Sequence, residues 1–179
     1  RGPQRLISAT MRRIVESLSD VPAMVMTNLG EVLLQNRMAV ALFGDYTRFT
    51  GLSRFLVYRY FTDPEQSALY PPEDREFRGR VFVADLRAEY TVDPRGTPGE
   101  IVEALLAVSD EFAEVWRLHE VDVTHHRELK RYLHADLGEL EMYGQPLLDA
   151  DQSQYVLAFT AVPGSPSDEK LRLLSARAG

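Results

Sequence analysis

The sequence predicts an α+β fold in which one antiparallel sheet of five strands is covered by helices on one face and by an N-terminal helix on the other. Two short apolar segments of strand character lie near the start of the chain, and three more lie in its last third. Helical patterns fill the region between them. The first two strands are apolar on both faces, so both faces should be covered.

The first 20 residues predict a helix. Apolar residues fall close to helical spacing at Leu6, Ala9, Ile14, Val15 and Leu18. The pattern stops before Pro22, which biases the preceding residue toward extended backbone. Residues 23–26 and 31–35 then predict two strands, joined by turn residues at 28–30.

The middle of the chain predicts several helices. Asn36 is a good N-cap and Gly44 a good stop for a short helix between them. An aromatic-rich segment covers residues 52–61. Helical stripes follow over residues 73–90 and 101–116, the second with a bend near Ser109, and a Pro- and Gly-rich break at 93–99 separates them.

The last third predicts strands at residues 129–134, 139–143 and 154–162, and a closing amphipathic helix at 168–176. The strands of the two ends can join in one sheet. The middle helices would then cover one face and the N-terminal helix the other.

Composition excludes several functions. The 179 residues include 27 acidic and 20 basic side chains, a net charge of −7, so we expect no specific binding of duplex DNA by this chain alone. The chain has no cysteine, which excludes disulfides, thiolate metal sites and cysteine nucleophiles.

The sequence lacks the patterns of a nucleophile elbow, a phosphate-binding loop and a zinc-protease helix, so we expect no enzyme. Without a long apolar run or a signal-peptide pattern, we expect a cytoplasmic protein that does not contact membranes.

Short motifs along most of the chain point to one family. They are residues 22–25 (PAMV), 32–37 (VLLQNR), 41–45 (ALFGD), 61–64 (FTDP), 68–71 (ALYP), 112–121 (FAEVWRLHEV), 130–134 (KRYLH), 138–142 (GELEM) and 160–167 (TAVPGSPS). In order and spacing the chain resembles the ligand-binding domain of MmyB-like transcription regulators. It departs from the family at Pro72, where a Trp is usual, and at Ala135, where a Pro is common.

The resemblance implies a PAS-like fold for residues 21–179. It also implies that residues 1–20 are a helix and linker that follow a missing helix-turn-helix domain, through which DNA would be bound. A homodimer and a pocket for a fatty-acid-like molecule are further implications.

For the dimer we expect the first helix to form the contact, because it offers more apolar surface than a short covering helix needs. The residues concerned are Leu6, Met11, Ile14, Val15 and Leu18.

We expect an apolar pocket between the middle helices and the sheet. Phe112 and Trp116 are one helical turn apart and would share its wall. Other candidate contacts are Phe77, Val81, Tyr60 and Met142, and Arg59 or His119 could reach a carboxylate. Core packing is the alternative for the apolar and aromatic residues, an exposed helix face for Arg59, and a structural or surface role for His119.

We expect no cofactor and no metal site. His125 and His126 are adjacent, so in an extended segment they would point to opposite sides and could not both bind the same metal ion. Two alternatives to a ligand sensor remain open. One is an interaction module whose pocket is packed shut by its own side chains, and the other is a PAS-like domain that carries haem or flavin.

Overall fold

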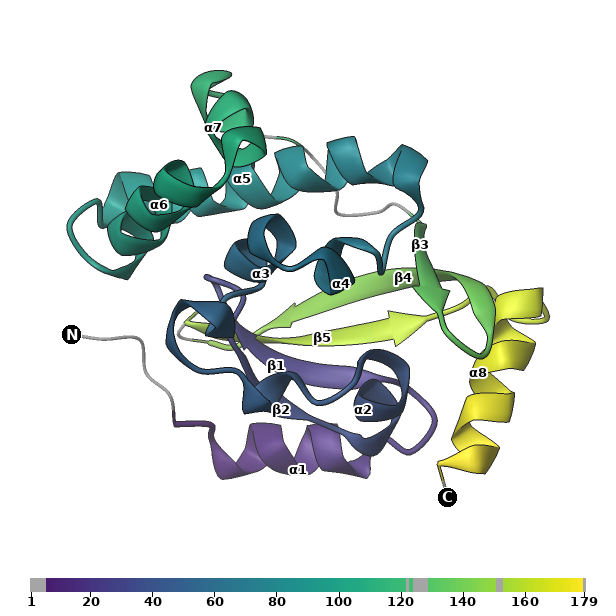
Figure 1. Ribbon diagram of the computed structural model, residues 1–179. Helices are drawn as coiled ribbons and strands as arrows, with labels where there is room; N and C mark the ends of the chain where they lie inside the picture. The colour runs from purple at the N-terminus through teal and green to yellow at the C-terminus, as the bar shows by residue number, and fades with distance from the viewer. Residues whose placement is uncertain (1–5, 122, 124–128, 151–152, 179) are drawn as a thin grey trace.

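The computed structural model describes residues 6–121, 123, 129–150 and 153–178, and it confirms the predicted α+β fold (Figure 1). One antiparallel sheet has the strand order β2-β1-β5-β4-β3. Its strands are β1 (Ala23–Thr27), β2 (Val32–Gln35), β3 (Lys130–His134), β4 (Gly138–Leu148) and β5 (Gln154–Thr160). The segment with His125 and His126 lies outside the described residues.

The first and last strands of the chain are neighbours in the middle of the sheet. Ala23 of β1 pairs with Ala158 of β5, and the ladder runs to Thr27 opposite Gln154. All five residues of β1 are buried, because helices cover this strand on both faces of the sheet. This position explains why the first hairpin is apolar on both faces.

Helix α1 (Ala9–Ser17) covers one face of the sheet, as the sequence predicts, and runs beneath β1 and β2 in Figure 1. Ser8 caps it by accepting a hydrogen bond from the Met11 backbone N–H. Met11 and Val15 are buried against Ala23 and Val25 of β1. These two apolar residues are therefore used for packing within the chain.

Asn36 ends the first hairpin and caps α2 (Arg37–Phe43), as predicted. Its Oδ1 accepts hydrogen bonds from the backbone N–H groups of Ala39 and Ala23. Its Nδ2 donates to the carbonyls of Leu18 and Val21. One buried amide thus joins α1, β1 and α2.

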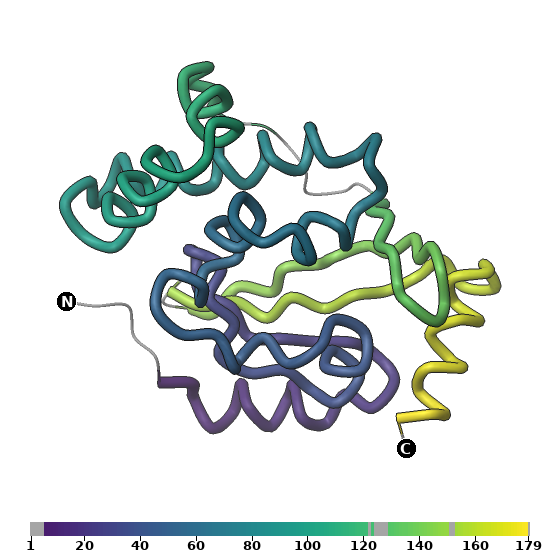
Figure 2. Tube along the Cα trace, in the orientation of Figure 1, coloured from purple at the N-terminus to yellow at the C-terminus, as the bar shows by residue number. Residues whose placement is uncertain are grey.

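The helices of the middle region form two layers over the other face of the sheet (Figures 1 and 2). They are α3 (Leu56–Thr62), α4 (Pro64–Ser67), α5 (Arg75–Val92), α6 (Thr97–Val108) and α7 (Asp110–Arg117), with short 3₁₀ turns at Tyr46–Arg48, Gly51–Arg54 and Pro72–Asp74. The bend expected near Ser109 is a break between α6 and α7. The Ser109 hydroxyl caps α7 by accepting from the Phe112 N–H.

Two further differences concern the last third of the chain. Strand β4 is longer than the predicted 139–143, because its second half pairs with β5 from Tyr143 opposite Thr160 to Leu148 opposite Tyr155. Helix α8 (Pro166–Arg177) begins two residues before the predicted start at residue 168, and it packs against β4 and α2. Within the described ranges, we find no helix long and apolar enough to cross a membrane.

Candidate functional site

A cavity of about 700 Å³ lies between α5 and the sheet. Strands β1 and β5 form its floor with alternate side chains, and α5 forms the opposite wall. Its apolar lining includes Met24, Met26, Leu157, Phe159, Phe43, Leu56, Leu69, Val81 and Phe82. The cavity therefore lies where the sequence predicts a pocket, between the middle helices and the sheet.

Strand alternation decides which residues face the cavity. Met24 and Met26 of β1 line it, whereas Ala23 and Val25 face α1. Gly144 of β4 also lies on the cavity side. A Cβ atom there would lie 3.4 Å from Leu157 Cδ1, so the missing side chain leaves room beside the floor.

One face of α5 supplies the opposite wall. Its lining residues are Arg78, Val81, Phe82, Asp85, Ala88 and Glu89. Their spacing of three, four, seven, ten and eleven residues from Arg78 places them on one helical face. Asp85 and Ala88 are also exposed, so the cavity opens to solvent along the later turns of α5.

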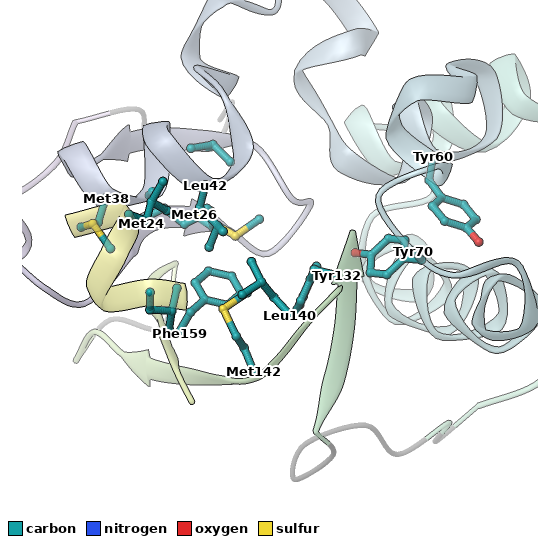
Figure 3. Packing of buried hydrophobic residues seen from close by; sticks show 14 residues of the cluster. Met24, Met26, Met38, Leu42, Tyr60, Tyr70, Tyr132, Leu140, Met142 and Phe159 are labelled. Carbon is teal, nitrogen blue, oxygen red and sulfur yellow. The ribbon is translucent and has the colours of Figure 1, made fainter. Parts of the chain in front are cut away.

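Four tyrosines add hydroxyl groups to the aromatic part of the lining: Tyr46, Tyr70, Tyr132 and Tyr155. The Tyr70 and Tyr132 rings lie side by side in Figure 3, with centroids 5.5 Å apart. Burial raises the pKa of both hydroxyls well above the ordinary value. Both hydroxyls therefore stay protonated near pH 7, and each can donate a hydrogen bond.

The charged lining residues lie toward different ends of α5. Arg78 is 7% exposed, near the start of the helix. Asp85 and Glu89 follow two and three turns later. Burial raises the pKa of Glu89, and the nearby charge of Asp85 raises it further. The cavity thus has a basic inner part and an acidic rim.

Of the predicted contact residues, Val81 lines this cavity. Tyr60 and Met142 belong to the hydrophobic cluster around it but are not among its lining residues (Figure 3). The Tyr60 hydroxyl instead donates to the Arg75 carbonyl. Phe77 is half-buried outside the lining, with the Arg78 guanidinium carbon 5.0 Å from its ring centroid.

Phe112 and Trp116 do not line the cavity, contrary to the expected position. They share a helical face, as predicted, but that face packs against the outer side of α5 in a second cluster with Val83 and Leu86. Phe112 is fully buried there and stacks on Trp116 with ring centroids 5.6 Å apart. Because α5 lies between α7 and the sheet, this face meets α5 and not the cavity.

Arg59 also lies outside the lining, although it is not on an exposed face. It is 1% exposed, and its Nε donates to Gln66 Oε1 while its Nη1 donates to the Ser53 and Arg54 carbonyls. Its guanidinium carbon lies 4.8 Å from the centroid of the Tyr46 ring. Gln66 and Tyr46 line the cavity, so Arg59 contacts two lining residues from outside the cavity.

His119 is exposed after α7, outside the cavity lining. Its φ of 51° is in the left-handed region, and its Nδ1 lies 3.3 Å from Arg87 Nη1. No group of three potential metal-ligating side chains gathers among the residues that the structure describes.

Sequence reasoning missed most of the lining residues. Met24, Met26, Leu157 and Phe159 alternate on strands, and that signal predicts a face without telling a packed core from a cavity wall. Arg78 was missed for another reason. Its distance of three residues from Val81 places it on the same helical face, but an arginine in such a pattern is more often solvated.

Comparison with known families gives one match. The family described as the MmyB-like transcription regulator ligand binding domain matches residues 7–174. The match covers both faces of the sheet, α5 and the whole cavity lining. A search of curated proteins found no match.

Proposed function

The chain belongs to the family of MmyB-like transcription regulator ligand binding domains, and from this premise we propose that the cavity between α5 and the sheet is its ligand site. The observation that carries the proposal is the cavity itself. Its volume of about 700 Å³ falls within the range of roughly 300–1,000 Å³ of small-molecule pockets. Its lining is mainly apolar and aromatic, with a few polar groups among them.

The proposed ligand is a small, largely apolar molecule of the fatty-acid type. Met24 and Met26 supply flexible, polarisable side chains that adapt to an alkyl chain. Each buried methylene contributes about 0.8 kcal/mol, so a long chain can bind without many polar contacts. The family resemblance favours the same class of ligand.

In the proposed regulator, DNA is bound by a helix-turn-helix domain that precedes residues 1–20, in the cytoplasm. Ligand binding changes the arrangement of that domain or of a dimer. A ligand can do so only if it binds two arrangements with different affinities. The walls formed by α5 and β5 are the elements that it would contact.

We further propose that two copies associate through α1. Leu6 and Ile14 are 80% and 52% exposed, so they remain available for a partner after Met11 and Val15 have packed on the sheet. Light scattering at tens of micromolar should then give about twice the 20.3 kDa mass of the chain. A mass near 20.3 kDa at that concentration contradicts the dimer.

The open volume favours a ligand site over an interaction module with a closed pocket. A haem or flavin domain makes a different prediction, because the purified protein would absorb visible light. We propose a binding role without catalysis, in keeping with the family.

Native mass spectrometry of the protein as purified tests the proposed function. We expect a population heavier than the bare chain, and an organic extract that contains an amphiphilic molecule of the corresponding mass. Protein that has been stripped of lipid should then regain this mass when the extract is returned. A bare chain that takes up no apolar molecule from any extract would contradict the proposal.

A further inference from the structure

The charges along the cavity wall follow the axis of α5. Arg78 lies at the inner part of the wall, and Asp85 and Glu89 lie at its rim. At the 1.5 Å rise of an α-helix, Asp85 is about 10 Å and Glu89 about 16 Å along the axis from Arg78. An amphiphilic molecule that fills the cavity lengthwise therefore meets opposite charges near its two ends.

The inner part of the wall has the chemistry of an anion site. The guanidinium of Arg78 carries several N–H donors, and the neighbouring Tyr70 and Tyr132 line the same cavity. The charge of Arg78 acts on both tyrosine hydroxyls and opposes the rise in their pKa, so all three groups lie within electrostatic reach of one another. Lys130 of β3 lines the cavity two residues from Tyr132 and adds a second positive charge.

Within the ligand site proposed above, we propose that Arg78 binds an anionic group of the ligand, aided by Tyr70 and Tyr132. The apolar part of the ligand then extends toward Asp85 and Glu89. This arrangement gives the ligand a single orientation and defines its class. The class is a monoanionic amphiphile, with no second negative charge at the far end.

The acidic rim is the reason why the ligand should carry no second negative charge at its far end. A carboxylate near Asp85 and Glu89 would add a third negative charge beside an exposed and a partly buried carboxylate. Two like charges repel more strongly beside a low-dielectric protein wall than in bulk water. The acidic pair thus selects against ligands that are anionic at both ends.

The first experiment measures calorimetric binding of dodecanoate and of dodecanol, which differ only in the head group. The wild-type protein should prefer dodecanoate. Arg78→Gln should lose roughly 10–100-fold in affinity for dodecanoate while its affinity for dodecanol changes by less than about threefold. Arg80→Gln is the matched control, because Arg80 lies on the same helix but pairs with Glu120, with 2.9 Å between Arg80 Nε and Glu120 Oε2.

The outcomes separate the two proposals. If wild-type protein and Arg78→Gln bind both probes alike, the assignment of Arg78 is wrong and the ligand site stands. If neither probe binds to wild-type protein, both proposals are wrong. Dodecanol binding and thermal melting show whether Arg78→Gln is folded.

A second experiment does not depend on the folding of Arg78→Gln. Dodecanedioate should bind to wild-type protein at least about tenfold more weakly than dodecanoate, because its second carboxylate meets the acidic rim. The double variant Asp85→Asn/Glu89→Gln should narrow that difference to about threefold or less. An undiminished difference in the double variant would overturn the proposed orientation.

Discussion

The guanidinium of Arg87 lies over the ring of Trp116, with the Arg87 Cζ atom 3.8 Å from the ring centroid. Its Nη2 also donates a hydrogen bond to the Trp116 carbonyl. These contacts fasten α7 to the outer face of α5, while the inner face of α5 lines the cavity. Trp116 thus stabilises the wall from the side opposite to the ligand.

Trp116→Ala should destabilise the domain without changing its affinity for an apolar ligand. The ring packs on Tyr90 and Phe112 but is only partly buried. We expect a loss of about 2–3 kcal/mol, below the ~3–5 kcal/mol typical of a fully buried aromatic residue. Chemical denaturation measures the loss, and calorimetry measures the affinity.

Leu157→Ala is the comparison for that prediction. Leu157 lines the cavity, so its truncation should change stability and ligand affinity together. A Trp116→Ala protein that is fully folded but binds dodecanoate much more weakly would place Trp116 at the ligand and contradict this assignment.

Asn36→Ala should cost about 2–4 kcal/mol of unfolding free energy. It removes the cap of α2 and leaves the carbonyls of Leu18 and Val21 without their amide donor. Asn36→Ser keeps an acceptor for the Ala39 N–H and should cost less. Equal losses in the two variants would show that the cap does not contribute.

Arg59→Lys should be destabilising by about 2–3 kcal/mol even though the charge is kept. A lysine ammonium cannot reproduce the planar fork that reaches Gln66, Ser53 and Arg54. Arg48→Lys, at an exposed position, should change stability by less than about 0.5 kcal/mol. Similar melting temperatures for the two variants would contradict this role of Arg59.

Stability should fall in alkaline solution as Tyr155 ionises. Burial, helped by the charge of Asp85, raises the pKa of Tyr155 to about 12 from an ordinary value of 10.0. The folded state therefore favours the neutral phenol. That contribution is complete below about pH 10 and is lost as the pH rises through about 12. Tyr155→Phe should show a smaller decline over this interval in denaturation experiments, and an identical decline would refute the assignment.

The fold was predictable because its signals are local. The cap at Asn36, the stop at Gly44 and the strands at β1 and β5 are confirmed by the structure. The length of β4 was not predictable in this way. Its residues from Tyr143 to Leu148 are held by pairing with β5, which is a contact between distant parts of the chain.

The site was harder to predict, because it depends on which apolar face meets which neighbour. The stripe with Phe112 and Trp116 is as regular as the stripe with Val81, yet α5 separates the first from the sheet. Helical spacing identifies the apolar face of a helix, but it does not show in which layer of the fold the helix lies. Arg78 shows this limit most clearly. A buried arginine on a cavity wall and an exposed arginine can have the same spacing from the apolar residues of a helix.

The most direct test of the account is to close the cavity without disturbing the core. Ala88 lies on the cavity wall and is also exposed, so Ala88→Phe should narrow the opening at little cost in stability. Ala107→Phe makes the same change at an exposed position of α6 that is not part of the lining. Calorimetric titration with dodecanoate should show at least about tenfold weaker binding to Ala88→Phe and unchanged binding to Ala107→Phe. Equal affinities in the two variants and the wild-type protein would contradict the claim that this cavity holds the ligand.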